Sequence, residues 1–236
     1  MKLRVLLGVG VALGMVACAG STPGPTPTPS RSPSPTDAAT PSPTPSPAAD
    51  DEQVSVTASG VGDYDLQAIP VAVLRNQASA HTAGSVVARF AVRHPGGVYD
   101  LGAPPVSLAP GEVLAVAALC TDVCRGAVGA DVTVTVGDWT SGGQQPLSAS
   151  TAAYRCGSPC AGNGGFEGDV SGTVSGSVAA GTPVDLFASC TSPTGAIVGG
   201  GITQTVWSGA TNQATVSVPV LVSARPDSCA LYGAVS

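Results

Sequence analysis

Four cysteines come closest to a chemical motif in this sequence. They form two pairs, Cys120 with Cys124 and Cys156 with Cys160, and each pair has three residues between its members. Four thiolates can bind zinc, so this set is a candidate metal or redox site. However, zinc knuckles usually have two intervening residues, and no Cys-x-x-Cys redox motif is present. Structural disulfides are the other interpretation, and the compartment of the protein decides between the two.

Histidine offers little further chemistry. His81 lies in the polar segment NQASAHTAG, and His94 stands at a strand end before a Pro-Gly-Gly turn. The sequence has no G-x-S-x-G elbow, no H-E-x-x-H zinc motif, no phosphate loop and no dinucleotide fingerprint. We therefore expect both histidines to be exposed loop residues, and we expect neither catalytic activity nor a cofactor.

Acidic residues are sparse and stand mostly beside glycine. Asp63 and Asp65 in GVGDYD and Asp100 in GGVYD could supply oxygen ligands to calcium, although aspartate beside glycine is also ordinary turn chemistry. Glu167 and Asp169 are two residues apart, which places both on one face of a strand. We expect that pair to be solvated and not catalytic.

The N-terminus indicates export and anchoring. Lys2 and Arg4 precede an apolar stretch over residues 5–16, which is too short to span a bilayer but suits the core of a signal peptide. The following Met15-Val16-Ala17-Cys18 resembles the lipobox of bacterial lipoproteins, although leucine is commoner at its first position. This resemblance implies cleavage after residue 17, a diacylglyceryl group on Cys18 and attachment to the extracytoplasmic face of the cell membrane. The alternative is an ordinary secreted protein that is cut nearby.

The count of cysteines agrees with an anchor. Seven cysteines leave one unpaired in an oxidising compartment, and lipid on Cys18 accounts for it. Six then remain for disulfide bonds, namely Cys120, Cys124, Cys156, Cys160, Cys190 and Cys229. Export therefore favours disulfides over a zinc or redox site.

Residues 19–49 are dominated by proline, threonine, serine and alanine. Such a composition cannot bury enough apolar surface to fold, and its prolines favour extended polyproline II. At about 3.1 Å per residue the stretch could reach up to about 90 Å. We interpret residues 18–52 as a lipid-anchored linker that carries the folded region away from the membrane.

Charge narrows the choice of partners. The net charge of −6 becomes −8 once the signal peptide, with Lys2 and Arg4, is removed, and no lysine follows Lys2. The seven remaining arginines form no basic run. This inventory argues against nucleic acid and against electrostatic binding to anionic lipid. We expect a protein or another envelope component as partner.

The region after the linker is predicted to be all-β. Short runs rich in valine and threonine recur between turn residues at intervals of about ten residues, which is typical of a sandwich or barrel. Examples are VSVTA (54–58), VAVLR (71–75), DVTVTV (131–136), VDLFASC (184–190) and ATVSVPVLV (214–222). No stretch has a helical period.

Two internal repeats are visible. Residues 107–136 match residues 177–206 at eleven of thirty positions without a gap, including Gly111 with Gly181 and Cys120 with Cys190. This match predicts two related units, 53–165 and 166–236. Trp139 and Trp207 follow the matched segments, where we expect packing in the core or at its rim. A shorter match, YDLQAIPV (64–71) with YDLGAPPV (99–106), is either a repeated strand-turn element or a coincidence.

The second unit resembles the small Ig-like sandwiches of bacterial lipoproteins, including the FxLYD type. The resemblance rests on the strand FEGDVSGTVSGSVAAG, the strand VDLFASC, the turn SPTGAIVGGG and a final strand pair, and it extends more loosely to residues 96–165. The FxLYD motif itself is absent, because Phe187 is followed by Ala-Ser-Cys. The resemblance implies an Ig-like β-sandwich that serves as an accessory module.

The repeat also predicts the disulfide pairing. Cys120 and Cys190 are equivalent, and the Arg-x-x-Ser segment before Cys160 matches the one before Cys229. We therefore predict Cys190–Cys229 and Cys120–Cys160, which leaves Cys124–Cys156. Together these features predict a lipid-anchored binding or accessory module without catalytic activity. The alternatives are a structural spacer of an envelope assembly and a metal or redox protein that uses the four paired cysteines.

Overall fold

The structure is a computed structural model that describes residues 52–142, 145–150, 152–157, 165–209 and 211–236. The predicted signal peptide, Cys18, all but the last residue of the linker, and Cys160 lie outside these residues. The prediction of an all-β chain is confirmed, since the described residues form sixteen strands and no helix. These residues accordingly contain no helix that is long and apolar enough to cross a membrane.

The strands form three sheets, and every strand pairing is antiparallel. The first sheet has the order β1-β2-β6, with β7 also paired to β2; its strands are β1 (Val54–Tyr64), β2 (Gln67–Asn76), β6 (Val113–Ala117) and β7 (Cys120–Thr121). The second is built around the long strand β3 (His81–His94), which pairs with β4 (Gly97–Gly102), β5 (Val106–Leu108), β8 (Gly129–Thr135) and β9 (Asp138–Ser141).

The third sheet contains the C-terminal strands in the order β10-β12-β15-β14-β13-β16, with β11 also paired to β12. Its strands are β10 (Ser148–Ala149), β11 (Ala153–Cys156), β12 (Phe166–Ser175), β13 (Pro183–Thr191), β14 (Ile197–Val206), β15 (Gln213–Val222) and β16 (Ser228–Val235). Thus β10 and β11, which belong to the predicted first unit, pair with a strand of the second.

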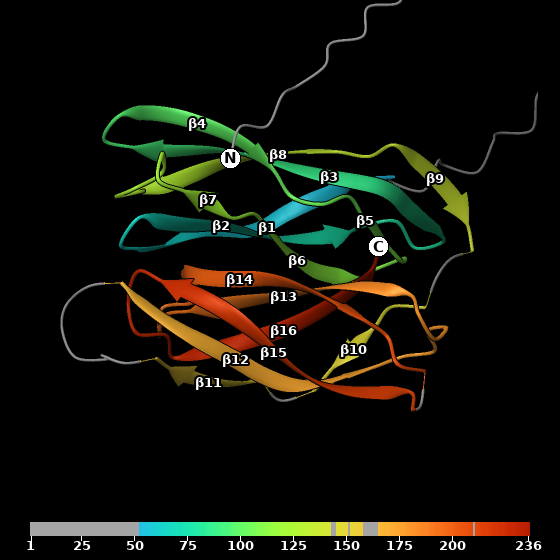
Figure 1. Ribbon diagram of the computed structural model, residues 1–236. Coiled ribbons are helices and arrows are strands. Elements are labelled where there is room, and N and C mark those ends of the chain that lie inside the picture. Colours follow the sequence, from blue (N-terminus) through green and yellow to red (C-terminus); the bar gives the residue numbers. More distant parts are fainter. Residues whose placement is uncertain (1–51, 143–144, 151, 158–164, 210) are drawn as a thin grey trace, which may run out of the picture. The chain divides into compact units, whose positions relative to one another are not determined.

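The third sheet bends sharply between β14 and β15. These strands form ladder pairs only at Gly199 with Val222 and at Gly200 with Leu221, although Gly201 still lies directly against Pro219. The bend places β12 and β15 opposite β13 and β16, and the apolar cluster between them includes Val170, Leu186 and Val218. Figure 1 shows the resulting layers, with β3, β4 and β8 above β1, β2 and β6, then β13, β14 and β16, and finally β12 and β15.

The inner strands are buried along most of their length because they are covered on both faces, and they are largely apolar, although β13 also buries Asp185 and Ser189. Residues 68–74 of β2 and 184–190 of β13 are all buried. In β13, Leu186 belongs to the C-terminal core while the adjacent Phe187 belongs to the N-terminal core. Outer strands such as β12 show the alternation of a half-buried strand instead. A continuous apolar run therefore marks the inner layers, and an alternating run marks the outer ones.

Glycines let the two inner layers touch through their backbones. A Cβ atom on Gly62 of β1 would lie 1.8 Å from the carbonyl oxygen of Leu221 and 3.0 Å from the Cα of Gly199. A Cβ on Gly60 would lie 2.4 Å from the carbonyl oxygen of Ile197. These strands are closer than any side chain would permit, so the glycines hold the N-terminal sheets directly on β14 and β15.

The longer repeat keeps its turns but not its strand pairing, and its second turn is closed in both copies, from Arg125 N to Asp122 O (3.4 Å) and from Gly195 N to Ser192 O (2.9 Å). Gly111 and Gly181 both have positive φ, 72° and 84°, a conformation that favours glycine. The turns are closed by equivalent hydrogen bonds, from Glu112 N to Ala109 O (3.0 Å) and from Thr182 N to Ala179 O (3.2 Å). Beyond the turns, β14 pairs with its neighbour β13, whereas the corresponding β8 pairs with β3 in a different sheet.

The shorter repeat has two different structures. In the first copy, Asp65 has a φ of 54° and lies in the turn between β1 and β2. In the second copy, Tyr99 and Asp100 lie within β4 and pair with Val92 and Ala91. The match is therefore not a repeated strand-turn element.

Glu112 makes the stability of this fold depend on pH. Its Oε2 accepts a hydrogen bond from Ala109 N at 2.6 Å, but burial dominates and raises the pKa of the carboxyl above its ordinary value of 4.5. The folded state therefore binds this proton more tightly than the unfolded state, so the free energy of unfolding falls as the pH rises from 4.5 through the folded pKa. We expect Glu112→Gln to remove this pH dependence, because glutamine does not titrate. Its amide oxygen can still accept the hydrogen bond from Ala109 N, so the local structure should be kept.

The measurement is urea unfolding of the wild type and of Glu112→Gln between pH 4 and pH 8. The variant should gain stability relative to the wild type as the pH rises. A difference between the two proteins that does not change with pH would contradict the assignment.

Candidate functional site

Two disulfide bonds join described cysteines and test the predicted pairing. Cys190 and Cys229 are bonded, with their Cα atoms 4.1 Å apart, and face each other across β13 and β16. This predicted pair is confirmed. The predicted pairing of Cys120 with Cys160 and of Cys124 with Cys156 is wrong, because Cys120 is bonded to Cys124, with Cα atoms 5.8 Å apart.

A tight turn after β7 explains the local bond. Val123 N donates to Thr121 O at 2.5 Å and Arg125 N donates to Asp122 O at 3.4 Å, so the chain reverses between the two cysteines. The repeat could not reveal this, because the position equivalent to Cys124 in the second copy is Thr194. Cys156 is also disulfide-bonded, and its predicted partner Cys124 is already engaged.

Two of the four cysteines considered as an alternative metal or redox site are bonded to each other in the structure, and Cys160 lies outside the described residues. Cys120 and Cys124 are oxidised to one another and both are buried. Within the described part of the chain, no three His, Cys, Asp or Glu side chains are grouped so that they could hold a metal ion. The Cys120–Cys124 bond therefore closes the base of the loop between β7 and β8.

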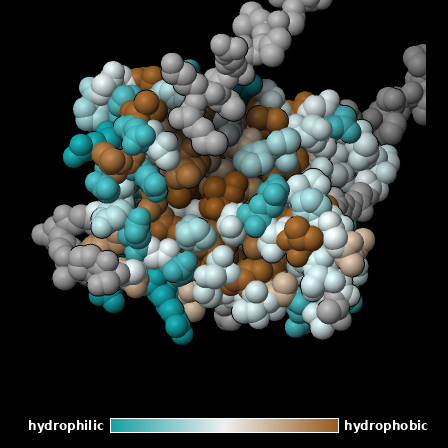
Figure 2. Space-filling model, in the orientation of Figure 1, coloured by the Kyte–Doolittle hydropathy of each residue, from teal (hydrophilic) through white to brown (hydrophobic). Residues whose placement is uncertain are grey.

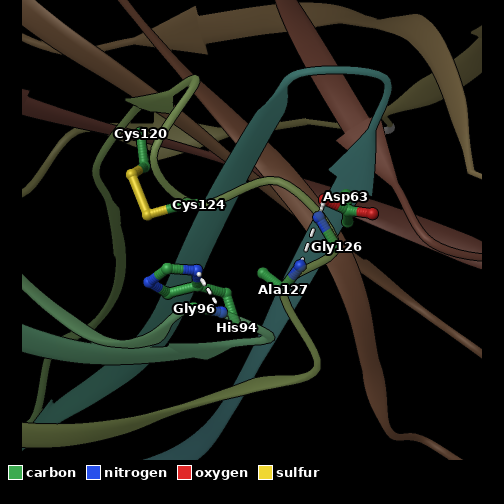
Figure 3. The surroundings of a disulfide bond; sticks show 7 residues. All are labelled: Asp63, His94, Gly96, Cys120, Cys124, Gly126 and Ala127. Carbon is green, nitrogen blue, oxygen red and sulfur yellow. Dashed lines mark hydrogen bonds between the residues drawn. A yellow bond between two sulfur atoms is a disulfide. The ribbon is translucent and has the colours of Figure 1, made fainter.

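Three turns and the strand ends that adjoin them meet around this disulfide, and we call them the loop tip: residues 63–67 from β1 to β2, residues 93–98 from β3 to β4, and residues 119–128 from β7 to β8. Asp63 joins two of them, since its Oδ1 accepts hydrogen bonds from Gly126 N (3.1 Å) and Ala127 N (3.3 Å) (Figure 3). One carboxylate oxygen thus holds two successive backbone amides across the tip.

Further backbone hydrogen bonds complete the tip. Asp122 N donates to Leu66 O at 2.6 Å, and Val128 N donates to Arg93 O at 2.9 Å. His94 Nδ1 accepts from Gly96 N at 3.2 Å, which fixes its own turn (Figure 3). Hydrogen bonds therefore join the segment after β7 to each of the other two segments, and the disulfide closes that segment itself.

The acidic residues and histidines considered as site residues do not form a cluster in the structure. Asp63, Asp65 and Asp100 are not brought together, since they lie at the end of β1, in the following turn and in β4. The prediction that both histidines are exposed loop residues is wrong, because His81 and His94 are the first and last residues of β3 and both are partly buried; Nδ1 of His81 lies 3.4 Å from Glu52 Oε1. Glu167 and Asp169 are exposed, as predicted.

Both tryptophans pack against apolar cores, which confirms the prediction for them. Trp207 is almost fully buried in the C-terminal core. Trp139 is partly buried against the N-terminal core. Neither residue is available as a flat aromatic platform for a sugar ring.

The loop tip is unusual because it exposes apolar side chains. Val128 is 80% exposed, and large parts of Leu66, Leu119, Val123 and Val98 are also exposed. Val128 and Val98 flank Arg93, to which both are joined through the backbone. Apolar side chains held on a rigid backbone cost little conformational entropy when they bind a partner, so the tip is suited to contact another protein.

A groove of about 350 Å³ begins next to the tip. Gln67 and Leu119, which flank the strand pairing of β2 with β7, form its near end. The rest of its lining comes mainly from β12, β14 and β15: Glu167, Gly168, Asp169, Ile202, Pro219, Val220 and Leu221. Sequence reasoning missed the groove, since its walls come from strands far apart in the chain.

Comparison with known proteins adds no assignment. No protein-family model matches the sequence. No curated protein shows significant similarity to it either. The function has to be argued from the loop tip, the groove and the N-terminal sequence.

Proposed function

We propose that this protein is a lipid-anchored, extracytoplasmic binding module without catalytic activity, and that its loop tip contacts a protein or another envelope component. The observation that carries the proposal is the exposure of Val128 and its apolar neighbours on a backbone held by a disulfide and by Asp63. The lipobox-like Met15-Val16-Ala17-Cys18 and the proline-rich linker support anchoring and display at a distance from the membrane.

We also propose a division of the folded region into two domains. We infer two related Ig-like units that share the inner interface between β1 and β14. Two separate apolar clusters support this, as does the equivalence of the Gly111 and Gly181 turns. The pairing of β10 and β11 with β12 favours a boundary between β9 and β10 rather than at residue 165.

The rival function is a structural spacer in an envelope assembly. A spacer needs only length and stability, and it has no use for exposed valine and leucine side chains on an ordered tip. Those side chains raise the risk of aggregation, so their presence favours a binder.

The test is photo-cross-linking in living cells that express the full chain. A photoreactive amino acid at position 128 should give discrete cross-linked products, whereas the same amino acid at exposed position 213, at the start of β15, should not. The Cys18→Ser variant should appear in the medium or the soluble extracytoplasmic fraction and lose the products. The spacer would be favoured if positions 128 and 213 gave the same products, and retention of Cys18→Ser in the membrane would overturn the anchor.

A further inference from the structure

The groove beside the loop tip has an apolar floor. Ile69 of β2, Ile202 of β14 and Leu221 of β15 converge there. Pro219 and Val220 continue the apolar lining along β15. Hydrophobic residues gather across the middle of the face shown in Figure 2, in the region where β1 and β2 approach β14.

The bend of the third sheet creates this groove. Leu221 pairs with Gly200 at the corner of the bend, and its side chain belongs to the N-terminal core. Past the corner, β15 pairs with β12, and the groove runs over Ile69 and Leu221, which are 6% and 5% exposed, and over the half-buried Ile202. The groove is therefore part of the rigid framework of the sheets, and the loop tip forms only its near end.

One rim of the groove is acidic. Glu167 and Asp169 project from the same face of β12, about 7 Å apart along the strand. The cross-strand neighbours of Glu167 are Leu221 and Gly157, neither of which carries charge. Asp169 lies opposite Arg155 of β11, so its charge is partly balanced. Of the two carboxylates, Glu167 is therefore the one without a basic residue opposite it on a neighbouring strand, and a basic side chain of a partner could pair with it.

This chemistry selects against several partners. Glu167 and Asp169 form no ion pair with the other described residues, and the whole chain has an acidic excess. A phosphate-bearing polymer or an acidic peptide would be repelled from the rim. An apolar side chain followed by a basic one matches both the floor and the rim.

We propose that the groove binds an extended peptide segment of a partner protein, with an aliphatic side chain on Ile69, Ile202 and Leu221 and an adjacent lysine or arginine at Glu167. This inference rests on the proposed function, since it names the chemistry of the partner that the tip would meet. The peptide would lie beside the loop tip, where Leu119 belongs to both surfaces.

The experiment uses the whole mature chain with Cys18→Ser, labelled at isoleucine and leucine methyl groups. The probe is the capped peptide acetyl-Gly-Ser-Leu-Lys-Ser-Gly-amide, titrated to millimolar concentration at low salt. We expect saturable shifts of the methyl resonances of Ile69, Ile202 and Leu221. Changing the peptide's lysine to glutamate should weaken binding at least about fivefold, because attraction to the rim becomes repulsion.

Two protein variants distinguish a specific contact with Glu167 from the effect of the protein's overall charge. Glu167→Gln should weaken the lysine peptide by about two- to fivefold, the range expected for an exposed ion pair. Asp100→Asn removes the same charge from exposed strand β4, outside the groove, and should leave the affinity unchanged.

Absence of saturable shifts, or equal affinity for the lysine and glutamate peptides, would overturn the groove assignment. If the cross-links from position 128 persisted in that case, the binding function would stand and the partner would contact the tip alone. If the cross-links also failed, the proposed function itself would be lost.

Discussion

Replacing Gly62 with alanine is expected to lower the free energy of unfolding by at least about 3 kcal/mol. The new Cβ would lie 1.8 Å from the carbonyl oxygen of Leu221, and that oxygen belongs to the backbone of a paired strand. No side-chain rotation can relieve the overlap. The inner layers would have to separate, and the packing of β1 on β14 and β15 would be lost.

Gly102→Ala is the matched control. Its Cβ would have one neighbour, the carbonyl oxygen of Ala88, at an ordinary contact distance of 3.9 Å. We expect this variant to stay within about 1 kcal/mol of the wild type, with a small gain possible from the less flexible unfolded chain. Urea unfolding followed by tryptophan fluorescence measures both variants. A loss below 1 kcal/mol for Gly62→Ala would show that the layers are not packed through their backbones.

Removing the Cys190–Cys229 bond with a double alanine variant is expected to cost about 4 kcal/mol, from the entropy of closing a loop of 40 residues in the unfolded chain. Removing Cys120–Cys124 should cost only about 2 kcal/mol by the same reasoning, because its members are four positions apart. The first bond ties β13 to β16 within the C-terminal core, whereas the second holds the loop tip.

Urea unfolding of the two double alanine variants under oxidising conditions tests this order. The loss of Cys120–Cys124 should also abolish the cross-links from position 128 while the C-terminal core remains folded. If the short-loop bond proved the more stabilising one, the ranking by loop length would fail for this protein.

The positions of many strands and the all-β class could be predicted from residue patterns, since turn residues separate short β-branched runs regardless of how the sheets stack. The distinction between inner and outer strands was also present, in the continuous run AIPVAVL (68–74) against the alternating FEGDVSGTVS (166–175). The order of the sheets was not predictable, because β3 pairs with strands that follow it by widely different distances.

The disulfides show where repeat-based reasoning succeeds and where it stops. The repeat placed Cys190 with Cys229, and these residues face each other across β13 and β16. It misplaced Cys120, because the turn after β7 brings Cys124 to Cys120, whereas the equivalent turn of the second copy carries Thr194 at that position. Short-range backbone geometry can thus override a pairing that long-range similarity suggests.

By itself, the sequence determined the all-β class and the Cys190–Cys229 bond, because each depends on local composition or on matched strands. It also carries the lipobox-like motif and the linker that lead us to propose a surface anchor. Only the tertiary structure decided the loop tip and the groove. Asp63 meets Gly126 and Glu167 lies near Ile69 because the sheets bend and stack, and no spacing along the chain records that approach.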